Sequence, residues 1–460
     1  MGPPLHISMK IFCTLLFLIL FSTPSLAGDF LSLSGRLDLR GGLALDSDSV
    51  KEDPSFTGRL KIDTPAARWY FHSWLEGGWD GKVEHPVRDH ALLKTWDEVY
   101  QSNTPWLEFK ELYLAYSSTD FEIRAGVQRF AWGRLDEYPI NDLLNPWDYS
   151  RFILPSLEDR KIGVPSLSAN LNKGNWSIDL AWIPLFVPYR LPQPNERWFG
   201  DSKITALARI PGAEIVPREP DLPPHTLENS EFGLRLRHGG ELDWALTLFH
   251  GFDPRPVFKT TALSIQPQAG KIVIDPGFVP DFHKTTVLGL DGAMILGDWS
   301  LRAEAAWTFN RPFMTRQELW GYPSIPAPGI FPLRPNRVKS DTLDYGIGAD
   351  YRLIEDCILT VQAQQTAIIR RPETLYERRF ETLLWANLKV FWLNQKVETN
   401  LNLAYNPEHG DGMARVNGWY VFTDSWKAGL TTAVFRGPAQ SLFGRYARND
   451  QVEGELVYSW

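Results

Sequence analysis

The chain has 460 residues, of which 43% are hydrophobic and 22% charged, and its mean hydropathy is -0.24. These values exclude a polytopic helical membrane protein, whose mean hydropathy would be positive, and the 13% aromatic content excludes a disordered chain. A formal net charge of -8 without any run of basic residues argues against a nucleic-acid-binding protein.

The N-terminal residues have the features of a cleaved secretory signal. Lys10 precedes an apolar run over residues 11–21, and Pro24 is followed by Ser25-Leu26-Ala27, a cleavage site with small residues at its first and third positions. The apolar run is too short for a spanning helix, which needs about 20 residues. We therefore expect cleavage of residues 1–27, with an uncleaved anchor as the alternative.

After this signal, apolar and polar residues alternate in many segments. Over residues 299–310 the apolar side chains occupy one face and mostly polar side chains the other, and the pattern recurs at 31–40, 343–352 and 397–406. A repeat of two residues indicates β-strands rather than helices. The sequence therefore predicts an all-β fold.

Long strands and unequal connections favour a transmembrane barrel over a soluble sandwich, which would also alternate. The predicted strands have about ten residues or more, whereas soluble strands usually have five or six. Short turns are predicted at 63–66, 117–120, 172–175, 238–241, 296–298, 353–356, 393–396 and 423–425. Longer segments run over 45–55, 81–105, 131–163, 185–227, 253–282, 311–340, 371–377, 407–412 and 437–450.

These features predict a single antiparallel barrel of about 18 strands over residues 28–460, in the outer membrane of a Gram-negative bacterium. In such barrels the short turns are periplasmic and the longer loops are external. Two interpretations of residues 257–274 remain open, an external hairpin or an extra pair of barrel strands.

Tryptophan residues gather at the predicted short turns. Trp176, Trp244, Trp299 and Trp426 follow a turn within a few residues, and Trp392 precedes one. The indole ring prefers the headgroup level of a membrane, where it forms aromatic girdles. We expect these residues to form the periplasmic girdle.

The chain ends with alternating residues, and Tyr458 and Trp460 lie on one face of the last predicted strand. This ending resembles the C-terminal signature of outer-membrane barrels, although Phe is the commoner last residue. The resemblance implies that the barrel assembly machinery recognises Tyr458 and Trp460 as an assembly signal.

The polar faces of the predicted strands carry charges of both signs. Barrels of 16–18 strands leave an aqueous channel, and charges inside them need water or a partner. Because the two signs nearly cancel, strong ion selectivity is not expected. The predicted lumen-lining residues are Arg36, Arg124, Arg235, Arg237, Arg302, Glu304, Glu398 and Arg415.

The segment 131–163 contains Leu143, Leu144 and Trp147, which a freely solvated loop would not need. We predict that it folds into the lumen as a constriction, with a short helix near 141–145. The charges expected at the narrowest point are Arg134, Asp136, Glu137, Asp142 and Asp148.

The segment 185–227 is rich in proline, which fixes φ and removes hydrogen-bond donors. We expect a stiff, extended external loop. A lid over the mouth, a surface for a partner and a rigid spacer all fit this composition.

The motifs Gly126-x-Gln128, Trp132-Gly133 and Asn145-Pro146-x-Asp148 resemble a group of uncharacterised proteobacterial outer-membrane barrels of porin-like type. They are more loosely similar to alginate-export and porin-type barrels. The resemblance covers this part of the chain only. It implies passage of solutes, with the third external loop as the constriction, and it names no substrate.

The sequence contains no hydrolase, nucleotide-binding or haem-attachment motif, so we expect no enzyme and no cofactor. Cys13 and Cys357 cannot form a disulfide framework once the signal is removed. His85, Asp89 and His90 share a loop and are expected to be solvated rather than bound to a metal. Acidic residues in the first external loop could bind Ca²⁺ or bridge through it to lipopolysaccharide, with a solvated loop as the alternative: Asp46, Asp48, Glu52 and Asp53.

We expect a channel for passive or facilitated passage of hydrophilic solutes. One alternative is a scaffold that encloses a partner protein in an export or electron-transfer complex, and another is an outer-membrane hydrolase. The expected partners are outer-membrane lipid, lipopolysaccharide, the barrel assembly machinery and an unidentified hydrophilic solute, without nucleic acid.

Overall fold

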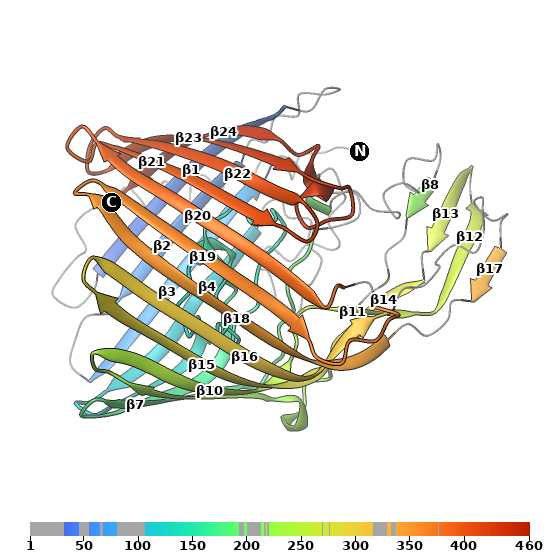
Figure 1. The fold of residues 1–460 in the computed structure, drawn as a ribbon, viewed down its shortest axis with the longest axis horizontal. Coiled ribbons are helices and arrows are strands. Elements are labelled where there is room, and N and C mark those ends of the chain that lie inside the picture. Colours follow the sequence, from blue (N-terminus) through green and yellow to red (C-terminus); the bar gives the residue numbers. More distant parts are fainter. Residues whose placement is uncertain are drawn as a thin grey trace, which may run out of the picture.

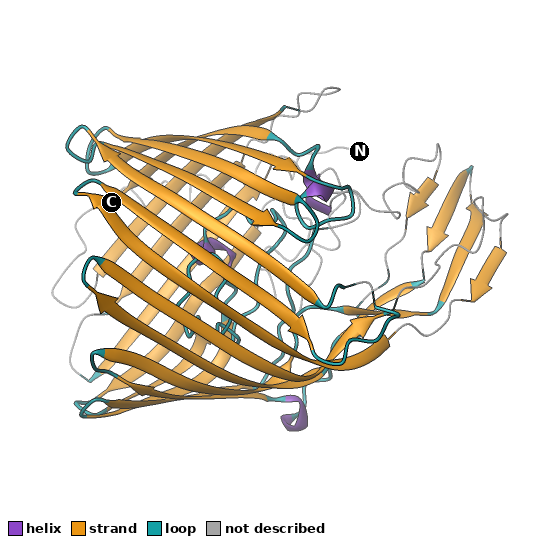
Figure 2. Cartoon of the chain, in the orientation of Figure 1, coloured by secondary structure: helices purple, strands orange, loops and turns teal. Residues whose placement is uncertain are grey.

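Eighteen strands form one closed antiparallel barrel in the computed structural model (Figure 1). The structure describes residues 32–45, 55–64, 68–80, 106–192, 197–199, 213–215, 218, 220–268, 270–275, 277–315, 329–332, 337–375 and 377–460. Strand is the dominant element, and the described helices are single short turns (Figure 2). Within these ranges no helix combines the length and the apolar character needed to cross a bilayer. The predicted signal at residues 1–27 lies outside them.

Each barrel strand pairs with its neighbours along the chain, and the last strand pairs with the first. The strands are β1 (Ser32–Ala44), β2 (Ser55–Asp63), β3 (Trp69–Asp80), β4 (Trp106–Ser117), β5 (Phe121–Gln128), β6 (Val164–Lys173), β7 (Trp176–Ile183), β9 (Glu231–His238), β10 (Leu242–Phe252), β15 (Lys284–Leu296), β16 (Trp299–Met314), β18 (Arg337–Ile354), β19 (Cys357–Ile368), β20 (Phe380–Trp392), β21 (Val397–Asn406), β22 (Asp411–Val421), β23 (Trp426–Arg436) and β24 (Gln451–Ser459). The ladder between β24 and β1, with Glu455 opposite Arg40, closes the barrel. The predicted fold class and strand number are therefore confirmed.

All the predicted short turns connect barrel strands at the same end of the barrel (Figure 1). At the other end, residues 257–274 leave the barrel, so the interpretation as an extra pair of barrel strands is wrong. They belong to two small external sheets. One joins β11 (Val257–Thr260) to β14 (Phe278–Asp281), and the other contains β8 (Ala213–Ile215), β12 (Ala262–Gln268), β13 (Lys271–Asp275) and β17 (Gly329–Pro332).

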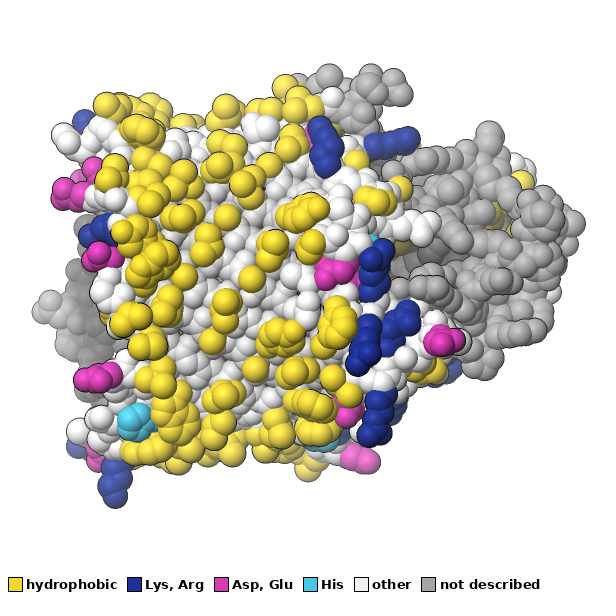
Figure 3. All heavy atoms as spheres, viewed as in Figure 1, with side chains coloured by type: hydrophobic (Ala, Val, Ile, Leu, Met, Phe, Trp, Pro, Cys, Tyr) yellow, Lys and Arg dark blue, Asp and Glu magenta, His cyan; other side chains and the backbone are white. Residues whose placement is uncertain are grey.

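The alternation of the sequence becomes the inside and the outside of the barrel. Leu288 and Leu290 on β15 and Leu403 on β21 are exposed on the outer face, where apolar side chains cover the wall (Figure 3). Neighbouring residues such as Asp291 and Glu304 face inward and are buried. An apolar outer band around a polar interior is the arrangement of outer-membrane barrels. The chain is an integral protein of the Gram-negative outer membrane.

Aromatic side chains lie at the end of the barrel that carries the short turns. Trp176, Trp299, Trp392 and Trp426 are exposed on the outer face, and the Trp244 ring packs on Trp176 with centroids 5.5 Å apart. These positions are those predicted for the periplasmic girdle. The short turns, rather than the aromatic residues, assign this end to the periplasmic side, because the longer loops of such barrels are external.

The facing of β16 predicts opposite results for two neighbouring residues. Ala303 is exposed on the outer face and paired with Gly292 and Ile347, so Ala303→Arg places a charge in hydrocarbon. We expect this change to lower the free energy of unfolding by roughly 2–4 kcal/mol, as for other lipid-facing charges. Denaturant unfolding of the protein in lipid vesicles would measure the loss.

The control for this prediction is Arg302→Ala on the inner face. Arg302 forms ion pairs with Asp136 and Asp350, which are partly accessible to lumen water, so its removal should affect conductance more than stability. Equal destabilisation by the two changes would contradict the assigned facing.

Candidate functional site

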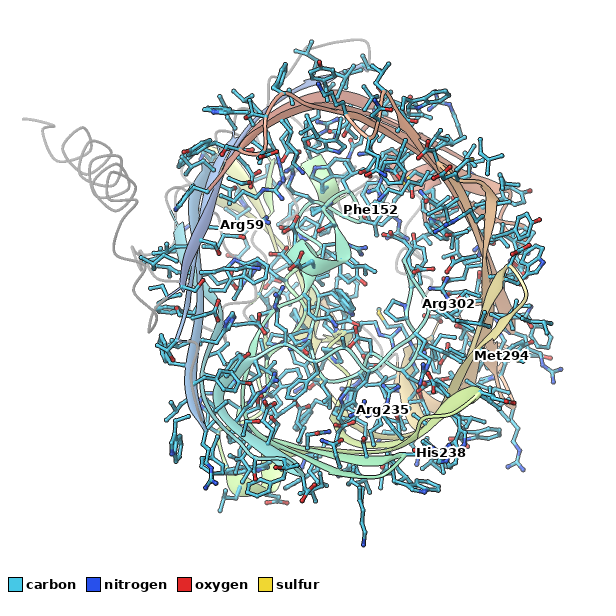
Figure 4. All side chains as sticks on the ribbon, turned by 90° about the vertical axis from the view of Figure 1, so that its left-hand side faces the viewer. Arg59, Phe152, Arg235, His238, Met294 and Arg302 are labelled. Carbon is cyan, nitrogen blue, oxygen red and sulfur yellow. The ribbon has the colours of Figure 1, made fainter. Side chains whose placement is uncertain are left out.

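Residues 129–163, called the inner segment here, leave β5 and run through the lumen before β6 begins. Figure 4 looks into the barrel from the end with the short turns and shows Phe152, on this segment, inside the ring of strands. The segment contains one helical turn, α2 (Leu157–Arg160), whose first turn is capped by the Ser156 side chain accepting from the Asp159 N–H. The segment is therefore placed where a constriction would have to lie.

The predicted helix near 141–145 is wrong, because two asparagine side chains bind backbone groups there. The Asn145 side chain donates to the carbonyls of Gln128 and Ile162 and accepts from the Phe130 N–H. Asn141 donates to the carbonyl of Leu290 on β15. Such side-chain bonds to the backbone compete with helix formation, and here they hold an irregular chain against the wall.

Glu304 on β16 fixes the inner segment to one wall of the barrel. Its Oε1 accepts the N–H groups of Arg134 and Leu135, and its Oε2 accepts those of Ile140 and Asn141 at 2.7 Å. The residue is only 3% exposed. Glu304 was predicted to line the lumen, and the structure shows it facing inward but covered by the segment that it holds.

Two apolar clusters attach the inner segment to opposite walls. Trp132 and Leu144 pack against residues of β7, β10, β15 and β16, including Phe249. Phe152 and Ile153 pack against the wall formed by β20 to β23 and against the connection before β24, where the Phe152 ring lies 4.2 Å from that of Tyr446. The segment therefore spans the lumen from one side to the other.

The five charges expected at the constriction do not form one ring. Arg134 pairs with Asp291, and Asp136 pairs with Arg302 at 2.7 Å, both across to the wall. Glu137, Asp142 and Asp148 instead pair with Arg160, Lys161 and Arg190, two of which belong to the inner segment itself. The pair between Asp136 and Arg302 faces lumen water, since the Asp136 side chain is 39% exposed, whereas the pairs of Glu137, Asp142 and Asp148 stabilise the fold of the segment.

Burial affects the protonation of two of these loop carboxylates. It raises the pKa of the Asp142 carboxyl above its ordinary value, against the opposing charge of Lys161. It also raises the pKa of Asp136, against Arg302. Both groups therefore take up a proton at a higher pH than a fully exposed carboxylate would.

Every predicted lumen-lining arginine has a partner. Arg36 pairs with Asp38 and Glu455, Arg124 with Glu122, Arg235 with Asp291, Arg237 with Asp179, and Arg302 with Asp136 and Asp350; Glu398 pairs with Lys389. Arg415 differs, because it donates to the carbonyls of Ile153 and Leu154 and so holds the inner segment. The lumen is thus lined by balanced pairs rather than by charges of one sign.

Sequence reasoning missed a buried ion network at the wall formed by β2, β3 and β4. Arg59 pairs with Glu76 and with Asp159 of the inner segment at 2.7 and 2.5 Å, and Lys110 lies 3.6 Å from Glu108. Glu108 and Lys110 are both buried, and the register between β3 and β4 shifts beside them at a β-bulge. Residues two apart in a regular strand share a face, so the sequence alternation also predicts that Glu108 and Lys110 face the same side. It does not predict their ion-pair partners or the additional residue of the β-bulge.

The described parts of the proline-rich segment 185–227 also contact the inner segment. The Tyr149 N–H donates to the Arg190 carbonyl, and the Tyr149 and Tyr189 rings are 5.3 Å apart. Trp198 belongs to the cluster around Phe152. Part of this segment therefore covers the external mouth instead of only extending away from it.

Several expected residues lie outside the described part of the chain: Cys13, Asp46, Asp48, Glu52, Asp53, His85, Asp89 and His90. In the described part, no group of three or more His, Cys, Asp or Glu residues could hold a metal ion. Cys357 is a buried free thiol.

Residues 82–420 match the family described as "Protein of unknown function (DUF1302)". The comparison with curated proteins gave no match. Among solved structures, OccK8 (OprE) of Pseudomonas aeruginosa is 10% identical, with 94% of this chain and 97% of that chain covered and a TM-score of 0.49. OpdK of the same organism, solved with vanillate, is 9% identical with 94% and 100% covered (TM-score 0.49), and OmpF of Salmonella typhi with daunomycin is 10% identical with 94% and 97% covered (TM-score 0.40).

Proposed function

Since the chain belongs to the DUF1302 family of proteins of unknown function, we propose its function from the barrel itself: an outer-membrane channel for passive or facilitated passage of hydrophilic solutes. An 18-strand barrel is wide enough to leave an aqueous channel. The inner segment then acts as the constriction, and Arg134 and Asp136 are the charges that a solute meets there.

The observation that carries this proposal is a charged, water-accessible lumen beside the inner segment. Asp136 on the inner segment and its neighbours Arg302 and Asp350 on the wall form ion pairs and remain partly exposed there. A charged side chain inside a barrel is stable only where water or an ion-pair partner solvates it, and partial exposure shows that water reaches these side chains. Among the described side chains, Figure 4 shows an open region between Phe152 and Arg302, along the axis of the barrel.

Reconstitution tests the proposal directly. The purified protein should give discrete conductance steps in planar bilayers, and liposomes that contain it should swell in small neutral sugars and amino acids. Permeability to cations and anions should be similar, because the lumen charges are paired. A barrel that inserts but neither conducts nor admits solutes would refute the channel.

A scaffold that encloses a partner protein is less well supported, because the inner segment occupies the space that such a partner would need. It attaches to opposite walls through Glu304, Phe152 and Trp132. No described feature favours a hydrolase, and the absence of enzymatic activity stays a prediction.

Lipopolysaccharide is a further proposed partner, supported by basic side chains along the external edge of the apolar band (Figure 3). Exposed bases there are Lys339, Arg370, Arg379 and Arg436. Guanidinium groups bind phosphates well because their donors match the geometry of the oxygens. The inner lipid portion of lipopolysaccharide carries phosphates at this level of the outer leaflet.

Replacement of Arg370 and Arg379 by Gln should lower the amount of lipopolysaccharide that copurifies with the barrel. Arg352→Gln, an exposed arginine at the periplasmic end of β18, is the matched control. Unchanged copurification in the double variant would argue against the proposed contact. The role of the barrel assembly machinery is tested separately below.

A further inference from the structure

A cavity of about 280 Å³ lies between the inner segment and the wall formed by β10, β15, β16, β18 and β19. Aromatic rings from both sides line it, with Tyr138, Trp147 and Tyr149 on the inner segment and Phe249 and Phe252 on β10. Its volume is near the lower limit of small-molecule sites, which suits one ring-sized molecule.

Backbone hydrogen bonds hold the aromatic lining in place. The N–H of Tyr149 donates to the Arg190 carbonyl at 2.8 Å, and the N–H of Tyr189 donates to the Pro254 carbonyl at 3.0 Å. The two tyrosine rings meet edge to face at the border of the cavity. The rings therefore form a preformed surface against which a flat or chair-shaped ring can lie.

The polar side of the cavity contains an arginine with unused donors. The Arg311 side chain is only 13% exposed, and its nearest carboxylates, Asp253 and Asp344, are 3.6 and 3.7 Å away. Among the described residues no acceptor lies within hydrogen-bond distance of its guanidinium. The guanidinium therefore keeps contact with water in the cavity, and a ligand that offers hydrogen-bond acceptors can take the place of this water.

A β-bulge turns Arg311 toward the cavity. The register between β16 and β18 shifts between Thr308 and Arg311, and Asn310 adopts a left-handed backbone with φ 53. Bulges of this kind redirect side chains and are common beside functional sites.

The charges around the cavity favour a neutral ligand. Arg255 pairs with Asp253 at 2.9 Å, Arg160 with Glu137 and Lys161 with Asp142, and Arg311 lies nearest to Asp253 and Asp344. Because these opposite charges balance, an anion or a cation would lose its hydration shell on entry without a net Coulomb attraction in return. A ligand group between Arg311 and the carboxylates of Asp253 and Asp344 must accept a hydrogen bond from the guanidinium and donate one to a carboxylate. A hydroxyl group does both.

We propose that this cavity is a binding site for a neutral polyhydroxylated ring, such as one sugar unit, which the protein holds during passage. The apolar face of the ring lies against Tyr149, Tyr189 and Phe252, and its hydroxyl groups bridge Arg311 to Asp253 and Asp344. This inference deepens the proposed channel function and rests on it for its biological meaning, but the binding step can be measured without transport.

Calorimetric titration of the purified full-length barrel in detergent tests the site with three probes that share one ring: D-glucose, D-glucuronate and D-glucosamine. D-glucose should bind to a single site, and the anionic and cationic analogues should bind at least about tenfold more weakly, because each loses the hydration of its charge and finds no net opposite charge in the cavity. Titration with a salt series separates this effect from general screening.

Two variants test the assigned contacts. Arg311→Gln keeps an unbranched polar side chain and removes the charged fork, and it should weaken D-glucose binding about tenfold or more, the effect of losing a charge-assisted hydrogen bond. Tyr189→Leu removes the stacking surface but keeps an apolar side chain, and it should weaken binding by a smaller factor. Arg352→Gln, an arginine outside the cavity, is the matched control and should bind like the unaltered protein.

Binding of D-glucose that is equal to or weaker than that of either charged analogue would overturn the proposal, as would binding that Arg311→Gln leaves unchanged. If the protein conducts but shows no D-glucose binding at any concentration tested, the sugar site would be overturned and the channel function would remain. A protein that binds D-glucose but does not conduct would instead reject the channel and keep the site. Thermal unfolding of Arg311→Gln beside the unaltered protein shows whether a loss of binding reflects a loss of fold.

Discussion

Replacement of residues 136–148 by a Gly-Ser linker of equal length should raise single-channel conductance by at least about twofold, because an 18-strand barrel without an inner obstruction leaves a wide aqueous channel. The linker removes Tyr138 from one apolar cluster and Ile140 and Leu144 from the other. The barrel should still insert, since the strand ladder does not involve these residues. Planar-bilayer recording and the size limit for neutral sugars would measure the change.

A single substitution gives an independent test of the same idea. In Glu304→Gln an NH₂ group takes the place of one carboxylate oxygen, so two of the four N–H groups of the inner segment face a donor. The segment should loosen, with higher and noisier conductance than in the unaltered protein. Glu398→Gln is the comparison, because this lumen carboxylate pairs with Lys389 and holds no part of the segment.

Unchanged conductance in the linker variant, together with cleavage of the inner segment by protease on intact cells, would place this segment outside the barrel. The constriction would then have to be sought in 185–227, whose described residues Tyr189 and Trp198 already lie at the mouth.

Deletion of Tyr458–Trp460 should abolish insertion and leave the chain in the periplasm. The Trp460 backbone exchanges two hydrogen bonds with Gly35, at 3.1 and 3.2 Å, and its ring lies where a Cβ on residue 35 would be. The Tyr458 ring packs on Trp426 with centroids 4.8 Å apart. The deletion therefore removes both the proposed assembly signal and the last contacts of the seam between β24 and β1. Membrane fractionation and heat-modifiable migration on gels would report the outcome.

Trp460→Phe keeps an aromatic ring at the end of the chain and should assemble normally, which separates recognition of the ending from simple truncation. A deletion variant that reaches the outer membrane as a heat-modifiable barrel would show that Tyr458 and Trp460 are not the signal.

The barrel could be predicted from the sequence because each strand has one lipid face and one lumen face. The alternation over residues 299–310 reports this directly, and Ala303 and Glu304 indeed face opposite sides. The alternation of apolar and polar residues no longer predicts the facing of a side chain where a β-bulge adds a residue to the strand. The shift before Arg311 is such a place, and nothing in the local sequence marks Arg311 as a residue of a cavity.

The inner segment was only partly predictable for a different reason. Its apolar residues indicated burial, but the partners that bury them come from strands far away in the sequence. The four N–H groups on Glu304 and the pair between Glu137 and Arg160 depend on a tertiary contact that no local pattern encodes. The helix expected at 141–145 failed for the same reason, since Asn145 binds chain segments on both sides of it.

The attachment of the inner segment also sets an order of events during biogenesis. The segment leaves the wall after β5, yet Phe152 and Ile153 rest on Phe435 and other side chains of β20 to β23 and of the connection before β24, which are made last. These residues have no surface to dock on until this last part of the chain has folded. The attachment to Glu304 on β16 can therefore form before the attachment to Phe435, and the two ends of the segment become fixed at different stages of folding.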